Sequence, residues 1–83
     1  MYTNTVTMIF GDPQNVKNFV FATSSLPNSM QVKIFQDTII VDGKSILGVL
    51  SLDFTKMVSV KFIDNKPIDK NLLKIFNQWI IGD

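Results

Sequence analysis

The stretch that organises this chain is Lys44-Ser45-Ile46-Leu47-Gly48-Val49-Leu50-Ser51-Leu52, near the middle of its 83 residues. Serine is favoured at the N-cap of a helix, because its hydroxyl can accept a hydrogen bond from a backbone N–H of the first turn. The apolar residues after Ser45 occupy nearly the whole circumference of the next two turns. The spacing therefore predicts a short helix that begins at Ser45 and runs to about residue 54.

This predicted helix has two apolar sides. At about 100° per residue, Val49 and Leu52 fall on one side, and Leu47 and Leu50 fall on another. A helix packed on one sheet needs a single apolar stripe. Either all of these side chains belong to the core, or Val49 and Leu52 face the sheet while Leu47 and Leu50 form an exposed docking patch. The periodicity alone leaves both interpretations open.

The segments on either side of this helix predict a mixed fold. Alternation of apolar and polar residues predicts strands over 2–10, 30–34 and 58–62, and β-branched residues predict a strand over 38–41. A turn at Gln36 and Asp37 would join strands 30–34 and 38–41 as a hairpin. Helical spacing predicts a first helix that starts at Asp12 and ends at Leu26. A last helix follows residue 67, with an apolar stripe of Ile68, Leu72, Ile75, Phe76, Trp79 and Ile80.

The resulting order, β-α-β-β-α-β-α, predicts the fold class. Mixed elements with a central hairpin favour an α+β open-faced sandwich, in which a four-stranded antiparallel sheet carries three helices on one face. The uncovered face would carry polar side chains. These are Thr5, Thr7, Lys33, Ser59 and Lys61. Eighty-three residues are too few for two cores, so residues 1–83 are expected to form a single domain.

Composition argues against several classes of function. The chain has no histidine and no cysteine, and its seven acidic residues are scattered aspartates, so no metal site and no cofactor is expected. A formal charge of +1, with all eight basic residues lysine, gives no reason to expect nucleic acid binding. No apolar stretch approaches the about 18 residues of a membrane span, and a signal peptide is not evident. We expect a cytoplasmic protein that does not act at membranes.

Residues 41–52, from Val41-Asp42-Gly43 through the Ser45 helix, closely resemble the regulatory-serine segment of the HPr phosphocarrier family of the bacterial phosphotransferase system. The predicted element order also matches that family. The resemblance implies a single HPr-like domain that binds partner proteins through the outward side of this helix, at Leu47 and Leu50. It also implies that Ser45 is a candidate for phosphorylation by a serine kinase, as in the Gram-positive branch of the family.

The same resemblance places the family's phosphocarrier histidine in the loop after the first strand, as the cap of the first helix. Alignment without gaps places Gln14 at that position, and a gapped alignment places Asp12 there. Neither side chain is an imidazole. A Gln at the histidine position also occurs in an HPr paralogue that acts only through its serine. The family's phosphocarrier chemistry is therefore not expected here, and no catalytic residue is assigned.

These observations predict a non-enzymatic, HPr-like regulatory or protein-binding module of the phosphotransferase system. It would bind a protein partner through the helix from Ser45 to Leu52, with Ser45 as a possible switch. Two alternatives stay open. One is a phosphocarrier component that uses another residue, Asp12 or Ser45, and the other is a structural or oligomeric domain without chemistry.

Overall fold

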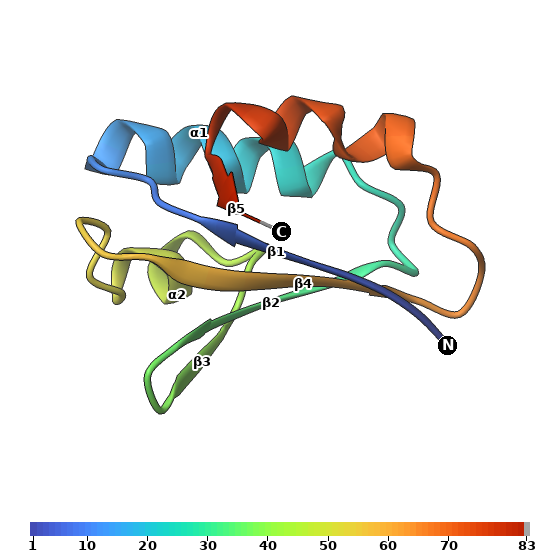
Figure 1. The fold of residues 1–83 in the computed structure, drawn as a ribbon, viewed down its shortest axis with the longest axis horizontal. Coiled ribbons are helices and arrows are strands. Elements are labelled where there is room, and N and C mark those ends of the chain that lie inside the picture. The colour runs from blue at the N-terminus through green and yellow to red at the C-terminus, as the bar shows by residue number, and fades with distance from the viewer. Residues whose placement is uncertain (83) are drawn as a thin grey trace.

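The chain forms a five-stranded antiparallel sheet with helices packed on one of its faces (Figure 1). The computed structural model describes residues 1–82. In chain order, the elements are β1 (Tyr2–Met8), α1 (Pro13–Ser24), β2 (Gln31–Gln36), β3 (Ile39–Asp42), α2 (Ile46–Leu50), β4 (Val58–Asp64), the 3₁₀ helix η1 (Lys70–Gln78) and β5 (Ile80–Gly82). The strand order across the sheet is β3-β2-β4-β1-β5. The α+β open-faced sandwich is confirmed.

The sheet has five strands, so the expected number of four is wrong. The extra strand, β5, lies antiparallel to the end of β1, pairing Ile80 with Met8 and Gly82 with Thr7 across an irregularity in register. A backbone hydrogen bond from Ile9 N to Trp79 O, 3.1 Å long, leads into this pairing. Three residues are too few to show a period of two, so the apolar pattern had assigned Ile80 to the preceding helix.

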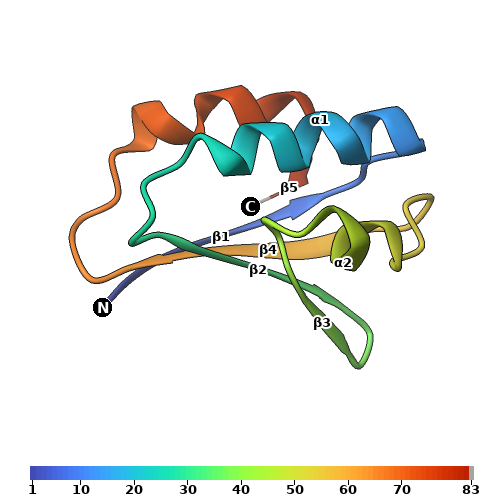
Figure 2. The same ribbon diagram turned by 180° about the vertical axis from the view of Figure 1, so that it is seen from behind.

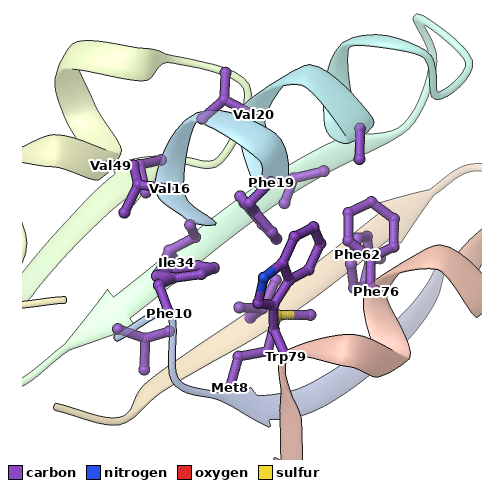
Figure 3. Packing of buried hydrophobic residues seen from close by; sticks show 14 of the residues in the cluster. Met8, Phe10, Val16, Phe19, Val20, Ile34, Val49, Phe62, Phe76 and Trp79 are labelled. Carbon is purple, nitrogen blue, oxygen red and sulfur yellow. The ribbon is translucent and has the colours of Figure 1, made fainter. Parts of the chain in front are cut away.

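Aromatic side chains hold the helices on the sheet. The ring of Phe19 on α1 lies 4.8 Å from Phe10, 5.5 Å from Phe76 and 5.8 Å from Trp79, between ring centroids (Figure 3). Phe62 of β4 closes the cluster at 5.1 Å from Phe76. Offset and edge-on aromatic pairs at these distances contribute about 0.5–1.5 kcal/mol each beyond the area they bury. This cluster joins α1, η1 and the central strand β4. Figure 2 shows α1 and η1 side by side over the sheet.

The last helix is a 3₁₀ helix, and its buried face differs from the expected α-helical stripe. Leu73, Phe76 and Trp79 are buried, whereas Leu72 and Ile75 are 42% and 55% exposed. A 3₁₀ helix has three residues per turn, so residues spaced by three align on one side. Since it rises about 2.0 Å per residue, η1 spans about 18 Å, which matches the about 18 Å of the twelve-residue α1.

The first helix follows the prediction closely. Asp12 is its N-cap, and the expected positions Val16, Phe19, Val20 and Thr23 are buried. The second helix is shorter than expected, because it ends at Leu50 rather than near residue 54. There the hydroxyl of Ser51 donates to Gly48 O at 2.6 Å, and Leu52 N bonds to Val49 O in a tight turn. Val49 and Leu52 face the core, as expected.

Within residues 1–82, the second face of the sheet carries no helix (Figure 1). Along β4 the buried residues Val58, Val60 and Phe62 alternate with the half-buried Ser59 and Lys61. The polar residues expected on this face are exposed or half-buried there. Among residues 1–82, no helix is long and apolar enough to cross a lipid bilayer.

Two glycines near α2 differ in what surrounds them. A Cβ on Gly43 would collide with the side chain of Val32, and the backbone of Gly43 is fixed by bonds from its N to Val32 O (2.7 Å) and from Thr23 Oγ1 to its own O (2.8 Å). A Cβ on Gly48 would lie 3.4 Å from both Ser45 Oγ and Val41 Cβ, which is ordinary contact. Gly43 therefore permits a close approach of the chain to β2 that no other residue would allow.

The same substitution at these two glycines should have different effects. We expect Gly43→Ala to lower the free energy of unfolding by about 1–3 kcal/mol, because the added methyl overpacks the contact with Val32. Gly48→Ala should leave it unchanged or raise it by up to about 1 kcal/mol, because alanine favours the helix. Urea unfolding followed by the fluorescence of Trp79 measures both. Equal losses in the two variants would contradict the assignment of the clash to Gly43.

Candidate functional site

The N-terminus of α1 is built from residues with structural tasks. Asp12 Oδ1 accepts a hydrogen bond from Asn15 N at 2.8 Å, as an N-cap does, and Pro13 occupies the first turn. Asn15 Nδ2 donates to Phe10 O at 2.8 Å. Gly11 adopts a φ of 87°, in the left-handed region that glycine reaches without strain. Together these contacts fix the loop between β1 and α1.

The two residues considered for the family histidine lie in different places. Asp12 is the cap of α1, whereas Gln14 lies within the first turn and is exposed. Gln14 Nε2 donates to Asn18 Oδ1 at 3.1 Å, along the outer side of the helix. The cap position therefore belongs to Asp12.

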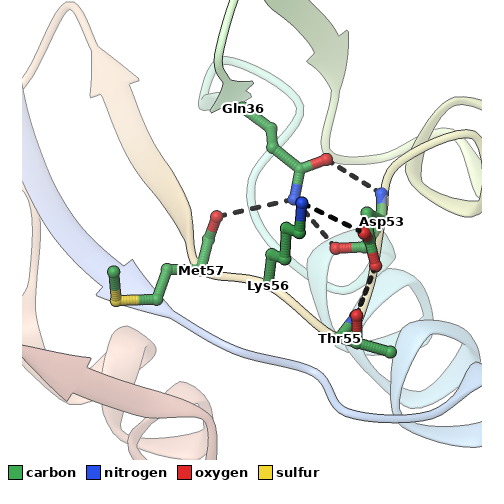
Figure 4. Close-up of polar contacts among 5 residues, drawn as sticks. All are labelled: Gln36, Asp53, Thr55, Lys56 and Met57. Carbon is green, nitrogen blue, oxygen red and sulfur yellow. Dashed lines mark hydrogen bonds and ion pairs between the residues drawn. The ribbon is translucent and has the colours of Figure 1, made fainter.

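This loop is held against the segment that follows α2. Gly11 N donates to Phe54 O at 2.7 Å. That segment is in turn fixed by the side chain of Gln36, whose Nε2 donates to Asp53 O and whose Oε1 accepts from Asp53 N, both at 2.8 Å (Figure 4). Gln36 is only 8% exposed. The sequence predicts a turn at Gln36, because no local pattern shows that its side-chain amide hydrogen-bonds to both backbone groups of Asp53.

The carboxylate of Asp53 is also engaged in this segment. Its Oδ1 accepts from Thr55 Oγ1 at 2.6 Å and from Thr55 N at 3.0 Å. These hydrogen bonds, together with Lys56 Nζ at 3.9 Å from Oδ2, hold the pKa of Asp53 below its ordinary value. A carboxylate of this kind is ionised at neutral pH, so Asp53 serves as a turn anchor rather than as a proton donor.

Ser45 begins α2 as predicted. Its Oγ accepts a hydrogen bond from Gly48 N at 3.2 Å, and its backbone N donates to Asp42 O at 3.1 Å. Lys44, next to it, donates from Nζ to Pro27 O at 3.2 Å and from its backbone N to Asp42 Oδ1 at 2.9 Å. The hydroxyl of Ser45 is therefore committed to the cap.

The two sides of α2 have different surroundings. Val49 is fully buried, against Val16 and Val20 of α1 (Figure 3). Leu47 is 79% exposed and points away from the core. Leu50 is half-buried and packs on the edge of the core. The structure thus brings only one of the two leucines fully to the surface, with Ile46 beside it at 37% exposure.

A third exposed apolar side chain, Phe21 at 82% exposure, lies on α1, the helix that packs against α2. The sequence analysis did not single it out. At about 100° per residue it lies opposite the buried positions Val16, Phe19 and Thr23, so a helical wheel shows an aromatic residue on the polar side. We define the α2 face as Phe21, Ile46, Leu47 and Leu50.

The described residues contain no group of three or more acidic side chains placed to hold a metal ion. Every buried polar side-chain atom of residues 1–82 has a hydrogen-bond partner. The exposed apolar side chains of this region are therefore its candidates for contact with another molecule.

Comparison with known proteins gives a likeness at the level of fold. No family model matches the sequence, and no curated protein matches it. The solved structure of HPr-C-His from Thermoanaerobacter tengcongensis is similar, with a TM-score of 0.62 at 23% identity over 89% of this chain and 84% of that chain. The phosphocarrier protein HPr from Bacillus anthracis superposes with a TM-score of 0.66 at 17% identity, over 95% of both chains. The chain has the fold of HPr phosphocarrier proteins.

Proposed function

We propose that this chain is a regulatory or protein-binding module on the HPr fold, and that it binds its partner through the α2 face without carrying a phosphoryl group. The observation that carries the proposal is the exposure of Leu47, at 79%, on a helix whose opposite side is fixed in the core. A helix anchored in this way presents its outer side chains with little conformational freedom left to lose on binding.

The α2 face has the character of a binding surface. Leu47 and Phe21 are the most exposed large apolar side chains on the two helices that pack together, at 79% and 82%. Burying a leucine or phenylalanine stabilises a complex by about 1.5–3 kcal/mol relative to leaving it in water. A single anchor of this kind within an interface can account for a large part of its affinity.

The absence of carrier chemistry rests on residue types. The chain has no histidine. The cap of α1, where an HPr histidine would stand, is Asp12, and one of its carboxylate oxygens already accepts from Asn15 N. Gln14, the other aligned residue, has an amide that is not nucleophilic. These facts favour binding over phosphoryl transfer.

A second candidate function follows from the place of Asp12. A carboxylate at the cap position is exposed and can in principle form an acyl phosphate. In that case, the protein would be a phosphotransferase-system carrier that uses aspartate instead of histidine. A labelling experiment separates the two functions.

Ser45 supplies a possible switch on the same surface. A phosphate at Ser45 would lie next to Ile46 and close to Leu47, adding a charge of about −1.5 to −2 beside an apolar contact. Charge at an apolar interface opposes binding, because both surfaces must lose water to form the complex. Phosphorylation at Ser45 would therefore release a partner bound through the α2 face.

Incubation with the general enzyme of the phosphotransferase system and labelled phosphoenolpyruvate tests the main proposal. We expect no acid-labile or base-labile label on the protein, while an HPr protein in the same mixture becomes labelled. Label that disappears in Asp12→Asn would establish the aspartate carrier instead. Label that disappears in Ser45→Ala would assign transfer to the serine.

Leu47→Glu should weaken binding to a phosphotransferase-system partner, using the general enzyme as the probe, by at least about tenfold, because the anchor is lost and a charge is buried. The free energy of unfolding should change by no more than about 0.5 kcal/mol, since the side chain is on the surface. Titration calorimetry measures the affinity. The matched control is Ile75→Glu on η1, which is also exposed and should bind normally; equal losses in both variants would rule out the α2 face.

The capping role of Ser45 can be tested separately from the effect of a negative charge at this position. Ser45→Ala should lower the free energy of unfolding by about 1 kcal/mol, because Gly48 N loses its acceptor. Ser45→Asp keeps an acceptor at the cap, so it should unfold like the original protein but bind the partner more weakly. Chemical denaturation and calorimetry on the same two variants give both values. If Ser45→Asp binds as tightly as the original protein, the switch is excluded.

A further inference from the structure

The edge of the sheet at β1 is only partly covered. β4 pairs with the whole of β1, from Tyr2 to Met8, on one side. On the other side, β5 pairs with Thr7 and Met8 alone. Within residues 1–82, the part of β1 from Tyr2 to Val6 therefore has no strand on its outer side, and unpaired strand edges are where other chains add to a sheet.

The backbone groups on this edge can be identified. Ile9 N donates toward Trp79 O, on the side of β5. Alternate residues of a strand direct their N–H and C=O groups to the same side, so Thr7, Thr5 and Thr3 present theirs to this edge. Thr7 lies opposite Gly82 of β5. Thr3 and Thr5 thus offer a row of donors and acceptors in line with β5.

A groove of about 470 Å³ lies beside this row, between β1 and η1. Its floor is apolar and includes Val6, Leu73 and Ile80. Its rim carries the exposed side chains of Lys70 and Lys74, together with Asn4 and Asn77. Among residues 1–82, no acidic side chain lines the groove, which thus combines an apolar base with the positive charge of two lysines.

We infer that this edge accepts an extended segment of a partner protein in which apolar and acidic residues alternate. The segment would add to the sheet beside Thr3 and Thr5, in line with β5. Main-chain hydrogen bonds supply affinity in this mode of recognition, and pockets for alternate side chains supply specificity. Here, apolar side chains would enter the groove, and carboxylates would lie close to Lys70 and Lys74.

Charge favours this occupant over a second copy of the chain. Two copies paired along the same edge would bring the rim lysines of each toward the other, and like charges placed together oppose association. A small amphipathic anion is disfavoured for a different reason. Such a ligand would form none of the main-chain hydrogen bonds that the backbone groups of Thr3 and Thr5 offer to an added strand.

This surface is separate from the α2 face. Helix α2 packs against α1 and β3, and β3 lies at the opposite end of the sheet from β1 and β5. A partner at the β1 edge and a partner at the α2 face would therefore not compete for the same residues. Either binding proposal can be refuted without refuting the other.

The test uses the full chain, labelled with ¹⁵N, and a capped seven-residue peptide of alternating valine and glutamate as the probe. We expect the peptide to shift the amide signals of Thr3, Thr5 and Lys74 and to slow hydrogen exchange at Thr3 and Thr5. A peptide of alternating valine and lysine should bind at least about tenfold more weakly, because it meets the lysine rim with like charge.

Two matched pairs of variants test the geometry. Thr5→Pro removes the edge N–H, which proline tolerates at an outward-facing edge position, and should abolish peptide binding, whereas Thr5→Ala should not. Lys74→Glu should weaken binding about tenfold, whereas Lys66→Glu, in the turn before η1, should leave it unchanged. The second pair stands even if Thr5→Pro does not fold.

Other outcomes would overturn the inference. Shifts confined to the α2 face, or equal affinity for the acidic and the basic peptide, would show that the β1 edge does not select this segment. Concentration-dependent dimerisation that Thr5→Pro removes and Thr5→Ala retains would make a second copy the occupant instead. Binding of hexanoate at the groove, with no change in exchange at Thr3 or Thr5, would assign it to a small anion.

Discussion

The contact between Phe19 and the aromatic pair Phe76 and Trp79 is the interaction on which the rest of this structure depends. It is the point at which α1 and η1 meet above the sheet, with ring centroids 5.5 and 5.8 Å from Phe19. The two η1 residues are separated by three positions, and both are buried. For both rings to face Phe19, the helix must repeat every three residues, which favours a 3₁₀ geometry over an α-helix.

The 3₁₀ geometry has consequences at both surfaces of the last helix. It turns Leu72 and Ile75 outward, although an α-helical period would have placed them in the stripe that packs. It also extends the chain far enough for Trp79 O to accept from Ile9 N, after which β5 can pair with the end of β1. The fifth strand thus directly follows the helix whose aromatic residues pack on Phe19. Within residues 1–82, β5 pairs with Thr7 and Met8, and the β1 edge from Tyr2 to Val6 has no strand on its outer side.

Most of the fold could be predicted from the sequence because its signals are local. Asp12 and Ser45 cap their helices as their residue types indicate, and the period-two and β-branched patterns located β1, β2, β3 and β4. The failures involve non-local causes. The residue type of Gln36 predicts a turn, but its amide hydrogen-bonds to the backbone of Asp53, seventeen positions away. The sequence near Ile80 contains no signal that this segment pairs with β1.

The candidate site was predicted less completely than the fold, for a related reason. A helical wheel separates inward from outward positions only when a helix has one packing partner. Helix α2 has two packing partners, α1 and β3. Leu50 is therefore half-buried, whereas Leu47 is exposed to solvent. The exposed Phe21 becomes a candidate binding residue only because α1 packs against α2, and no local sequence pattern shows that contact.

The two cap residues help this fold to keep its shape independently of the other side chains on its surface. At the start of α1, Asp12 accepts from Asn15 N, and at the start of α2, Ser45 accepts from Gly48 N. Each cap needs only an oxygen acceptor, which the carboxylate of Asp12 and the hydroxyl of Ser45 both provide. The core, the two caps and the close approach of Gly43 to β2 hold α2 in the position that leaves Leu47 exposed. This support does not depend on the chemistry of the loop before α1.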